Sequence, residues 1–298
     1  MKPQIKQFLA YLHHERGLSA RTRDAYHRDL EHLSSYLAEQ GVSGPGQVTE
    51  HHVRALIARR HRQGLKGKSL QRMLSSIRAY FRWAMRERLA AQNPAAAVRA
   101  PKSPRHLPAT LDLETIGRLL DIREQTPLAV RDKAIMELFY SSGLRLSELT
   151  QLRWAQLDLG SGMVSVTGKG NRERMVPVGR KAIEALREWR KAHAAIAGIG
   201  EPRVFVTQHG KPISSRAIQA RIRHWAIRQG LPQQVHPHLL RHSFASHMLE
   251  SSGDLRAVQE LLGHADISTT QIYTHLDYQH LARVYDQAHP RARKKISS

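Results

Sequence analysis

The chain has 298 residues, with 47 lysines and arginines against 25 aspartates and glutamates, a formal net charge of +22 and no cysteine. This length is enough for two domains with separate cores, and the hydrophobic (41%) and charged (24%) fractions are ordinary for a soluble globular protein. Because the positive excess is spread along the chain, it predicts a large surface that binds a polyanion. A basic protein that is merely soluble is the alternative.

The composition also excludes several classes of protein. Without cysteine there are no disulfides, no thiolate catalysis and no cysteine-ligated zinc. No apolar stretch approaches the roughly 20 residues of a membrane-spanning helix, and the N-terminus, from Met1 to Ile5, lacks the core of a signal peptide. We therefore expect a cytoplasmic protein without membrane insertion, in a compartment that contains DNA.

Residues 1–98 are predicted to form a helical domain. Apolar residues recur at helical spacing in four stretches, and Ser19, Thr49 and Ser69 open the last three of them. Basic residues crowd the polar faces of the third and fourth helices, with almost no acidic residues to balance them. We predict that this stretch binds phosphates, although a run of charge is more often an ordinary solvated face. The predicted DNA contacts are Arg59, Arg60, Lys68, Arg72 and Arg78.

Residues 99–109 separate this domain from the rest of the chain. They contain three prolines, two arginines and a lysine, which is typical of an extended, semi-rigid linker. Such a linker would join two basic lobes that are able to close as a clamp around a duplex.

Residues 110–298 are predicted to mix helices with short strands, so the expected fold class is mainly α with a small β-sheet. A hairpin is predicted where the β-rich runs Met163–Thr167 and Arg174–Val178 flank the turn at Lys169, and Val204–Thr207 is predicted as a short strand. Helices are predicted at Leu111–Asp121, Leu128–Ser142, Lys181–His193, Ser215–Gln229, Pro237–Ser251, Leu255–Leu262, after Ser268, and at Gln279–Ala288.

A histidine and an arginine predict a phosphate site on one of these helices. Pro237 suits the first turn of a helix, which places His238 at the helix N-terminus, where backbone N–H groups favour an anion. His238 lies three residues before Arg241 and shares its face, whereas His236 and His242 point elsewhere. The alternative is a surface helix rich in histidine and arginine.

Four further residues are candidates, and each also has an ordinary interpretation. Arg145 follows Gly143-Leu144 at the start of a helix and could form a structural ion pair. Lys169 lies between glycines at the hairpin tip, where a solvated turn residue is usual. His264 follows Gly263 at a corner between helices, where a structural histidine is common. Tyr273 is one of eight tyrosines.

Taken together and in this order, these residues resemble the active site of the tyrosine recombinase family, the integrases of the lambda-integrase type. The catalytic residues that the resemblance implies are Arg145, Lys169, His238, Arg241, His264 and Tyr273. The resemblance spans essentially the whole chain. It implies an all-helical, SAM-like core-binding domain at 1–98, a linker at 99–109, and a catalytic domain at 110–298 that ends in a partner-docking helix.

The residue types suit the reaction that the resemblance implies. A phenol with a pKa near 10 is a weak nucleophile at neutral pH, so Tyr273 needs a proton acceptor and electropositive surroundings. Two arginine forks neutralise the non-bridging oxygens as charge develops. His238 is suited to accept the phenolic proton, His264 to donate a hydrogen bond, and Lys169 to protonate the leaving 5′-oxygen. The resulting O-(3′-phospho-DNA)-tyrosine intermediate conserves bond energy, so neither a metal nor ATP is expected as a cofactor.

The C-terminal third carries a finer resemblance. The stretches Glu250–His264, Ser268–Leu276 and His280–Pro290 look like the Xer branch of the family, which resolves chromosome dimers. This implies recombination at a dif-like site in double-stranded DNA, through a Holliday junction, by a nucleoid-associated protein. The implied partner is a XerD-like paralogue in a heterotetramer of two plus two subunits, and control by the FtsK translocase stays open.

Several other functions remain as alternatives. A phage or plasmid integrase belongs to the same family, and a type IB topoisomerase shares the chemistry but lacks the Xer-like C-terminal third. A non-catalytic DNA-binding regulator would have no use for six active-site residues in order. A histidine-ligated metallohydrolase could use His236, His238, His242 and His247, but residues 236–249 contain no carboxylate to help bind a metal.

Overall fold

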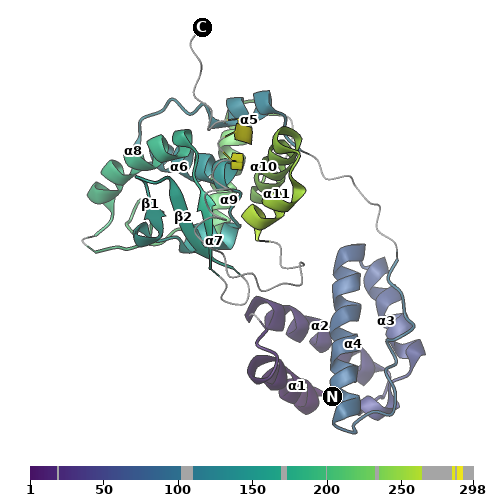
Figure 1. Cartoon of the computed structure of the whole chain (residues 1–298). Helices are drawn as coiled ribbons and strands as arrows, with labels where there is room; N and C mark the ends of the chain where they lie inside the picture. The colour runs from purple at the N-terminus through teal and green to yellow at the C-terminus, as the bar shows by residue number, and fades with distance from the viewer. Residues whose placement is uncertain are drawn as a thin grey trace. The chain divides into compact units, whose positions relative to one another are not determined.

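The computed structural model describes residues 1–18, 20–101, 110–168, 173–198, 200–231, 235–263, 284–285 and 287–290. The chain divides into two compact units, Met1–His106 and Leu107–Ser298 (Figure 1). Most of the described chain is helical, and a single three-stranded sheet lies in the second unit. The predicted fold class, mainly α with a small sheet, is confirmed. No helix among the described residues is both long enough and apolar enough to cross a membrane.

The first unit is a bundle of four helices in which α4 packs against the other three. Its centre is aromatic, with the ring of Phe8 lying 5.5 Å from Tyr80 and 5.7 Å from Trp83. Thr49 caps the third helix as predicted, whereas the fourth starts at Gly67 rather than at Ser69. The elements are α1 (Lys2–His14), α2 (Ala20–Glu39), η1 (Pro45–Gln47), α3 (Glu50–Arg62) and α4 (Gly67–Arg86).

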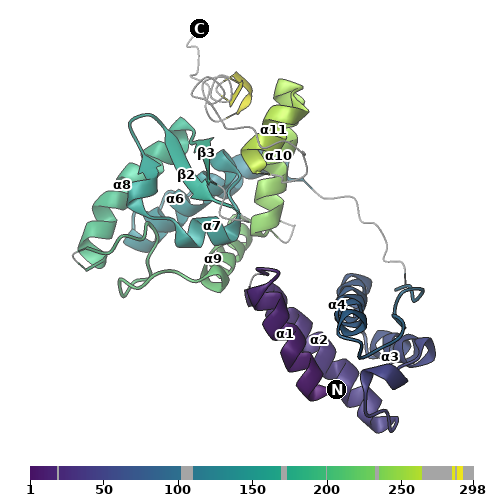
Figure 2. The ribbon, with the colours of Figure 1, turned by 60° about the horizontal axis from the view of Figure 1, so that its bottom comes forward.

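The second unit is built around α6, which is buried along almost its whole length. Helices α8 and α10 pack against different sides of it, with α11 beside α10 (Figures 1 and 2). The strands pair antiparallel in the order β1-β2-β3. The helices are α5 (Leu113–Leu120), α6 (Pro127–Ser142), α7 (Leu146–Gln151), η2 (Trp154–Gln156), α8 (Arg180–Ile196), α9 (Ser215–Arg228), α10 (Pro237–Ser252) and α11 (Leu255–Leu262), and the strands are β1 (Leu157–Asp158), β2 (Met163–Thr167) and β3 (Glu173–Pro177).

Two strand assignments differ from the sequence prediction. Strand β1 was not predicted, because its two residues are too few to show an alternating pattern. The predicted strand Val204–Thr207 is wrong, since the described structure has a single isolated bridge within this stretch, between Val206 and Pro212. Its apolar residues are buried in the core, so their hydrophobicity reflects burial rather than membership of a sheet.

The end of the chain packs into its own unit where the structure describes it. Tyr285 is 1% exposed, and its hydroxyl donates to the carbonyl oxygen of Ser141 at 2.9 Å. Its ring stacks on His289 with centroids 4.8 Å apart. Most of the predicted helix Gln279–Ala288 lies outside the described residues, and docking of this helix on a neighbouring subunit stays a prediction.

Candidate active site

Arg145 is positioned by the sharp turn between α6 and α7. Gly143 ends α6 in the left-handed region with φ 55°, and a Cβ atom there would lie 2.4 Å from the ring of Phe244. Only glycine avoids both the strain and the clash. The turn places Arg145 as the N-cap of α7, where its backbone N–H donates to the Glu148 carboxylate at 2.7 Å.

Three arginines converge on the C-terminal end of α11. Arg174 donates to the carbonyl of Leu261 at 3.3 Å, Arg241 to that of Leu262 at 2.6 Å, and Arg145 to that of Gly263 at 2.8 Å. The last carbonyls of a helix lack intrahelical partners and carry partial negative charge, so cations are favourable there. Three successive carbonyl groups at the end of α11 therefore bind one guanidinium each and keep the three side chains close together.

Gly263 is required at this helix end for two reasons. Its φ of 63° lies in the left-handed region. A Cβ atom would also lie 3.0 Å from the Arg174 side chain, so a larger residue would displace that arginine.

Glu148 supplies the buried negative charge of this cluster. Its two carboxylate oxygens accept from Arg174 at 2.8 and 2.9 Å, and Arg145 donates to the same carboxylate at 2.9 Å. Burial by itself would raise the pKa of Glu148, but hydrogen bonds from Arg174 and Arg145 outweigh it and hold the pKa below its ordinary value. The carboxylate is therefore ionised at neutral pH, and the cluster keeps two positive charges in excess.

Arg241 is the arginine of this cluster whose charged form is disfavoured. Burial, followed by repulsion from Arg145, lowers the pKa of Arg241 to about 10. The side chain also donates to the carbonyl of Gly143, so it joins the ends of α6 and α11. An anion bound beside Arg145 and Arg241 would relieve their repulsion.

His238 lies at the start of α10, where the sequence analysis placed it. His236 is the N-cap of this helix and its Nδ1 accepts from the backbone N–H of Leu239 at 3.1 Å, with Pro237 in the first turn. His238 is exposed and lies one turn before Arg241 on the same helix. The two neighbouring histidines thus have different roles, since one holds the helix end and the other faces solvent.

The structure brings together only part of the predicted set. Arg145 and Arg241 meet at the end of α11, and His238 lies on the helix that carries Arg241. Lys169, His264 and Tyr273 lie outside the described residues. Strands β2 and β3 flank the predicted hairpin turn, and α11 ends at Leu262, two residues before His264 in the sequence.

Sequence reasoning missed Glu148 and Arg174. Arg174 pairs with Val166 across the sheet, on the face that also buries Val164 and Val176. Alternation along the strand was the available signal, because it places a charged residue on the apolar face. A buried arginine requires a partner, and Glu148 in the first turn of α7 provides it.

The predicted DNA contacts of the first unit differ in whether their side chains already bind partners within the protein. Arg72 pairs at 2.7 Å with Asp29, whose side chain is 3% exposed. Arg78 donates to the carbonyls of Ala95 and Val98, which anchors the segment after α4. Arg59 pairs with Glu39, Arg60 donates to Gln63 at 2.8 Å, and Lys68 is exposed in the first turn of α4.

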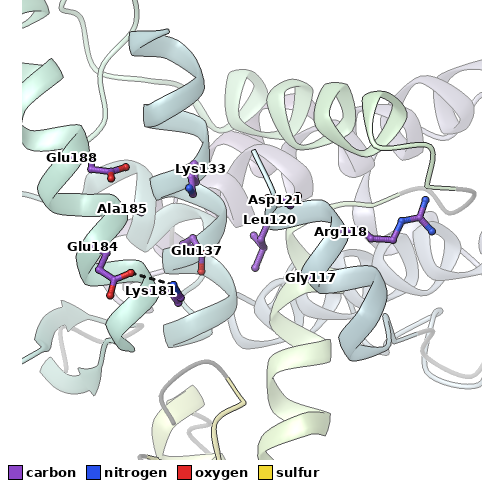
Figure 3. Close-up of a pocket in the computed structure, with 10 residues that line it drawn as sticks. All are labelled: Gly117, Arg118, Leu120, Asp121, Lys133, Glu137, Lys181, Glu184, Ala185 and Glu188. Atoms are coloured by element: carbon purple, nitrogen blue, oxygen red, sulfur yellow. Dashed lines mark ion pairs between the residues drawn. The ribbon is translucent and has the colours of Figure 1, made fainter. Parts of the chain in front are cut away.

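A polar cavity of about 460 Å³ lies elsewhere in the second unit, among α5, α6 and α8 (Figure 3). Its wall carries both signs of charge, and Lys181 pairs with Glu184 at 3.4 Å. None of the predicted active-site residues that the structure describes lines it. The arginine cluster at the end of α11, rather than this cavity, is therefore the candidate active site.

Comparison with known proteins identifies the family of this chain. A model of the phage integrase family matches residues 109–280, and a model of the phage integrase N-terminal SAM-like domain matches residues 5–88. Tyrosine recombinase XerC of Xanthomonas axonopodis pv. citri is 55% identical over 301 residues, which cover 98% of each chain. Tyrosine recombinase XerC of Xylella fastidiosa is 54% identical over 295 residues, which cover 99% of each chain.

A solved structure has the same fold. The XerH site-specific recombinase bound to palindromic difH substrate matches with a TM-score of 0.72 and 21% identity, over 91% of this chain and 81% of that one. The chain therefore belongs to the phage integrase family and is a site-specific DNA recombinase of the tyrosine type. The predicted family is confirmed, and so is the predicted likeness to the Xer branch, most of all to XerC.

Proposed function

We propose that Arg145 and Arg241 hold the phosphate at which this recombinase cuts DNA. Each guanidinium has five N–H donors. Hydrogen bonds to the described residues occupy two donors on Arg145 and two on Arg241. Donors therefore remain on both side chains for the non-bridging oxygens. The convergence of Arg145 and Arg241 on the last carbonyl groups of α11, with hydrogen-bond donors to spare, is the observation that carries this proposal.

The nucleophile in this proposal is Tyr273. Its phenolic proton passes to His238, its oxygen forms a bond to phosphorus, and the bond from phosphorus to the 5′-oxygen breaks. Lys169 gives a proton to that oxygen, and His264 donates a hydrogen bond to the phosphate as charge develops. The product is a 3′-phosphotyrosyl linkage with a free 5′-hydroxyl, and reversal of the step rejoins the strand without ATP or a metal.

The proposed biological role is resolution of chromosome dimers at a dif-like site. The curated relatives are named XerC, and the XerH structure contains a difH substrate, which supports a site of this kind. Residues 1–98 would bind the core of the site and residues 110–298 would carry out the chemistry. Two copies of this chain and two of a XerD-like paralogue would exchange strands through a Holliday junction.

The test uses a nicked suicide duplex of the host's candidate site, on which a cut strand cannot be rejoined. The wild-type protein should form a covalent DNA–protein adduct. Tyr273→Phe should bind the duplex equally well and form no adduct, because only the attacking oxygen is lost. Tyr278→Phe is the matched control and should form adduct normally. Adduct at full yield with Tyr273→Phe would refute the assignment of the nucleophile.

A further inference from the structure

A second cavity, of about 440 Å³, lies between α7 and strand β2 of the second unit. Two arginines, Arg153 and Arg203, share its wall with the polar side chains of Ser147, Gln151, Gln156 and Thr167. Glu148 also borders the cavity, but Arg145 and Arg174 already neutralise its carboxylate. The available groups are therefore mainly positive charges and neutral hydrogen-bonding groups.

Arg153 and Arg203 face each other across an isolated antiparallel bridge. The backbone N–H of Trp154 donates to Pro202 at 2.9 Å and that of Val204 to Leu152 at 2.9 Å. Hydrogen bonds on either side identify Arg153 and Arg203 as a non-hydrogen-bonded pair, for which Cα atoms lie about 4.5 Å apart and side chains are closest. Like charges at such positions are destabilising.

Neither arginine has a carboxylate partner within the described part of the chain. The Arg203 guanidinium donates to the neutral side-chain oxygen of Gln151, and Glu201 accepts from the backbone N–H of Arg203 at 2.9 Å rather than from its side chain. Arg153 is exposed. Two arginines at paired positions, with no carboxylate partner among the residues that the structure describes, favour the binding of an external anion.

We propose that Arg153 and Arg203 together hold one phosphate of the DNA backbone, away from the point of cleavage. This inference rests on the proposed function, which makes duplex DNA the polyanion at this face. Ser147 lies two residues after Arg145, and Thr167 is the last residue of β2, at the base of the hairpin that carries Lys169. A phosphate held by Arg153 and Arg203 would therefore fix the position of the DNA strand relative to the proposed catalytic groups of Arg145 and Lys169.

The test compares Arg153→Gln, Arg203→Gln and the double variant with Arg123→Gln. Arg123→Gln removes the same charge from an exposed arginine, whose side chain is 87% exposed. The affinity for a random-sequence duplex is measured from about 50 to about 200 mM salt. Loss of one phosphate contact reduces the log–log slope by about 0.9. Each single variant should therefore lower the slope by about 0.9. Because the two arginines share one phosphate, the double variant should lower the slope by the same amount, about 0.9. Arg123→Gln should change the slope little.

Thermal unfolding supplies the second measurement. Removing one of two opposed like charges should leave the melting temperature unchanged or raise it. A lower melting temperature with a salt slope equal to that of Arg123→Gln would mean that the pair is structural, and would overturn the proposal. A slope that falls by about 1.8 in the double variant would mean two separate phosphates, and would overturn the shared site.

Failure of the proposed function is distinguishable from failure of this site. Wild-type protein that forms no adduct on the suicide duplex, but whose salt slope depends on Arg153 and Arg203, would refute the nucleophilic chemistry and leave the phosphate site standing. Wild-type protein that forms adduct, with variants that bind like Arg123→Gln, would refute only the phosphate site.

Discussion

Arg174 and Glu148 are joined by two parallel hydrogen bonds of 2.8 and 2.9 Å in the interior of the second unit. Arg174 lies on β3 and Glu148 in the first turn of α7, so the pair connects strand β3 to the helix whose N-cap is Arg145. Arg174 also donates to the carbonyl of Leu261 at 3.3 Å, in the last turn of α11. The buried Glu148 carboxylate thus joins β3 to α7, and Arg174 extends this connection to the end of α11.

Removal of the Glu148 charge should destabilise the second unit strongly. Glu148→Gln leaves the guanidiniums of Arg145, Arg174 and Arg241 without their buried anion, and breaking a buried ion pair costs about 3–5 kcal/mol. Urea unfolding followed by tryptophan fluorescence measures this loss. Glu184→Gln is the control, because its ion pair with Lys181 is exposed and should contribute little. Equal small losses in both variants would contradict the structural role of Glu148.

Stability should fall in two steps as the pH is lowered. Burial lowers the pKa of His247 below its ordinary 6.5, so the unfolded chain takes up this proton first and stability declines as the pH falls below about 6.5. The pKa of Glu148 is held below its ordinary 4.5, so its contribution is present above that pH and is lost as the pH falls further. Thermal unfolding of His247→Gln from pH 8 to 3 tests the first step. Its melting temperature should decline less between about pH 6.5 and 5, and an unchanged decline there would assign the step to other groups.

The outline of this architecture was predictable from local patterns, and the arginine cluster was not. Thr49 begins α3 as predicted and α6 ends at the predicted Ser142, because the ends of a helix depend on neighbours in sequence. The contacts of Arg174 with Glu148 and Leu261 span 26 and 87 residues, so they depend on how the sheet packs against α7 and α11. Arg145 and Arg241 could be identified from their sequence motifs. The backbone carbonyls that orient their side chains could be identified only from the folded structure.

Charge neutralisation in the first unit should separate DNA contacts from structural residues. Lys68→Gln removes an exposed charge and should reduce the slope of log affinity against log salt by about 0.9 without changing the melting temperature. Arg72→Gln should lower the melting temperature, because it leaves Asp29 buried without its cation. Salt titrations on a duplex and thermal scans of both variants measure these effects. An unchanged slope for Lys68→Gln would identify that side chain as part of an ordinary solvated surface.

The C-terminal segment should contribute to the stability of its own subunit. The Tyr285 hydroxyl contacts the carbonyl and the hydroxyl of Ser141, and the Ser141 hydroxyl accepts from the backbone N–H of Gly179 at 2.6 Å. Tyr285→Phe removes these buried hydrogen bonds and should cost about 1–3 kcal/mol in the isolated protein, measured by thermal unfolding. If stability is unchanged in isolation and only the cooperative filling of two adjacent half-sites falls, the segment acts on a neighbouring subunit instead.

The role of Lys169 can be tested by chemistry that removes the need for a proton. If Lys169 protonates the leaving 5′-oxygen, Lys169→Ala should slow cleavage of ordinary DNA severely, by about 10²–10⁴-fold for a lost general acid. A substrate with sulfur in the 5′-bridging position has a leaving group that departs without protonation, so the variant should cleave it at nearly the wild-type rate. Arg145→Ala is the matched control, because an arginine that stabilises charge on the non-bridging oxygens remains necessary with either leaving group. Equal impairment of Lys169→Ala on both substrates would remove Lys169 from the role of general acid and leave it as a DNA contact of the hairpin.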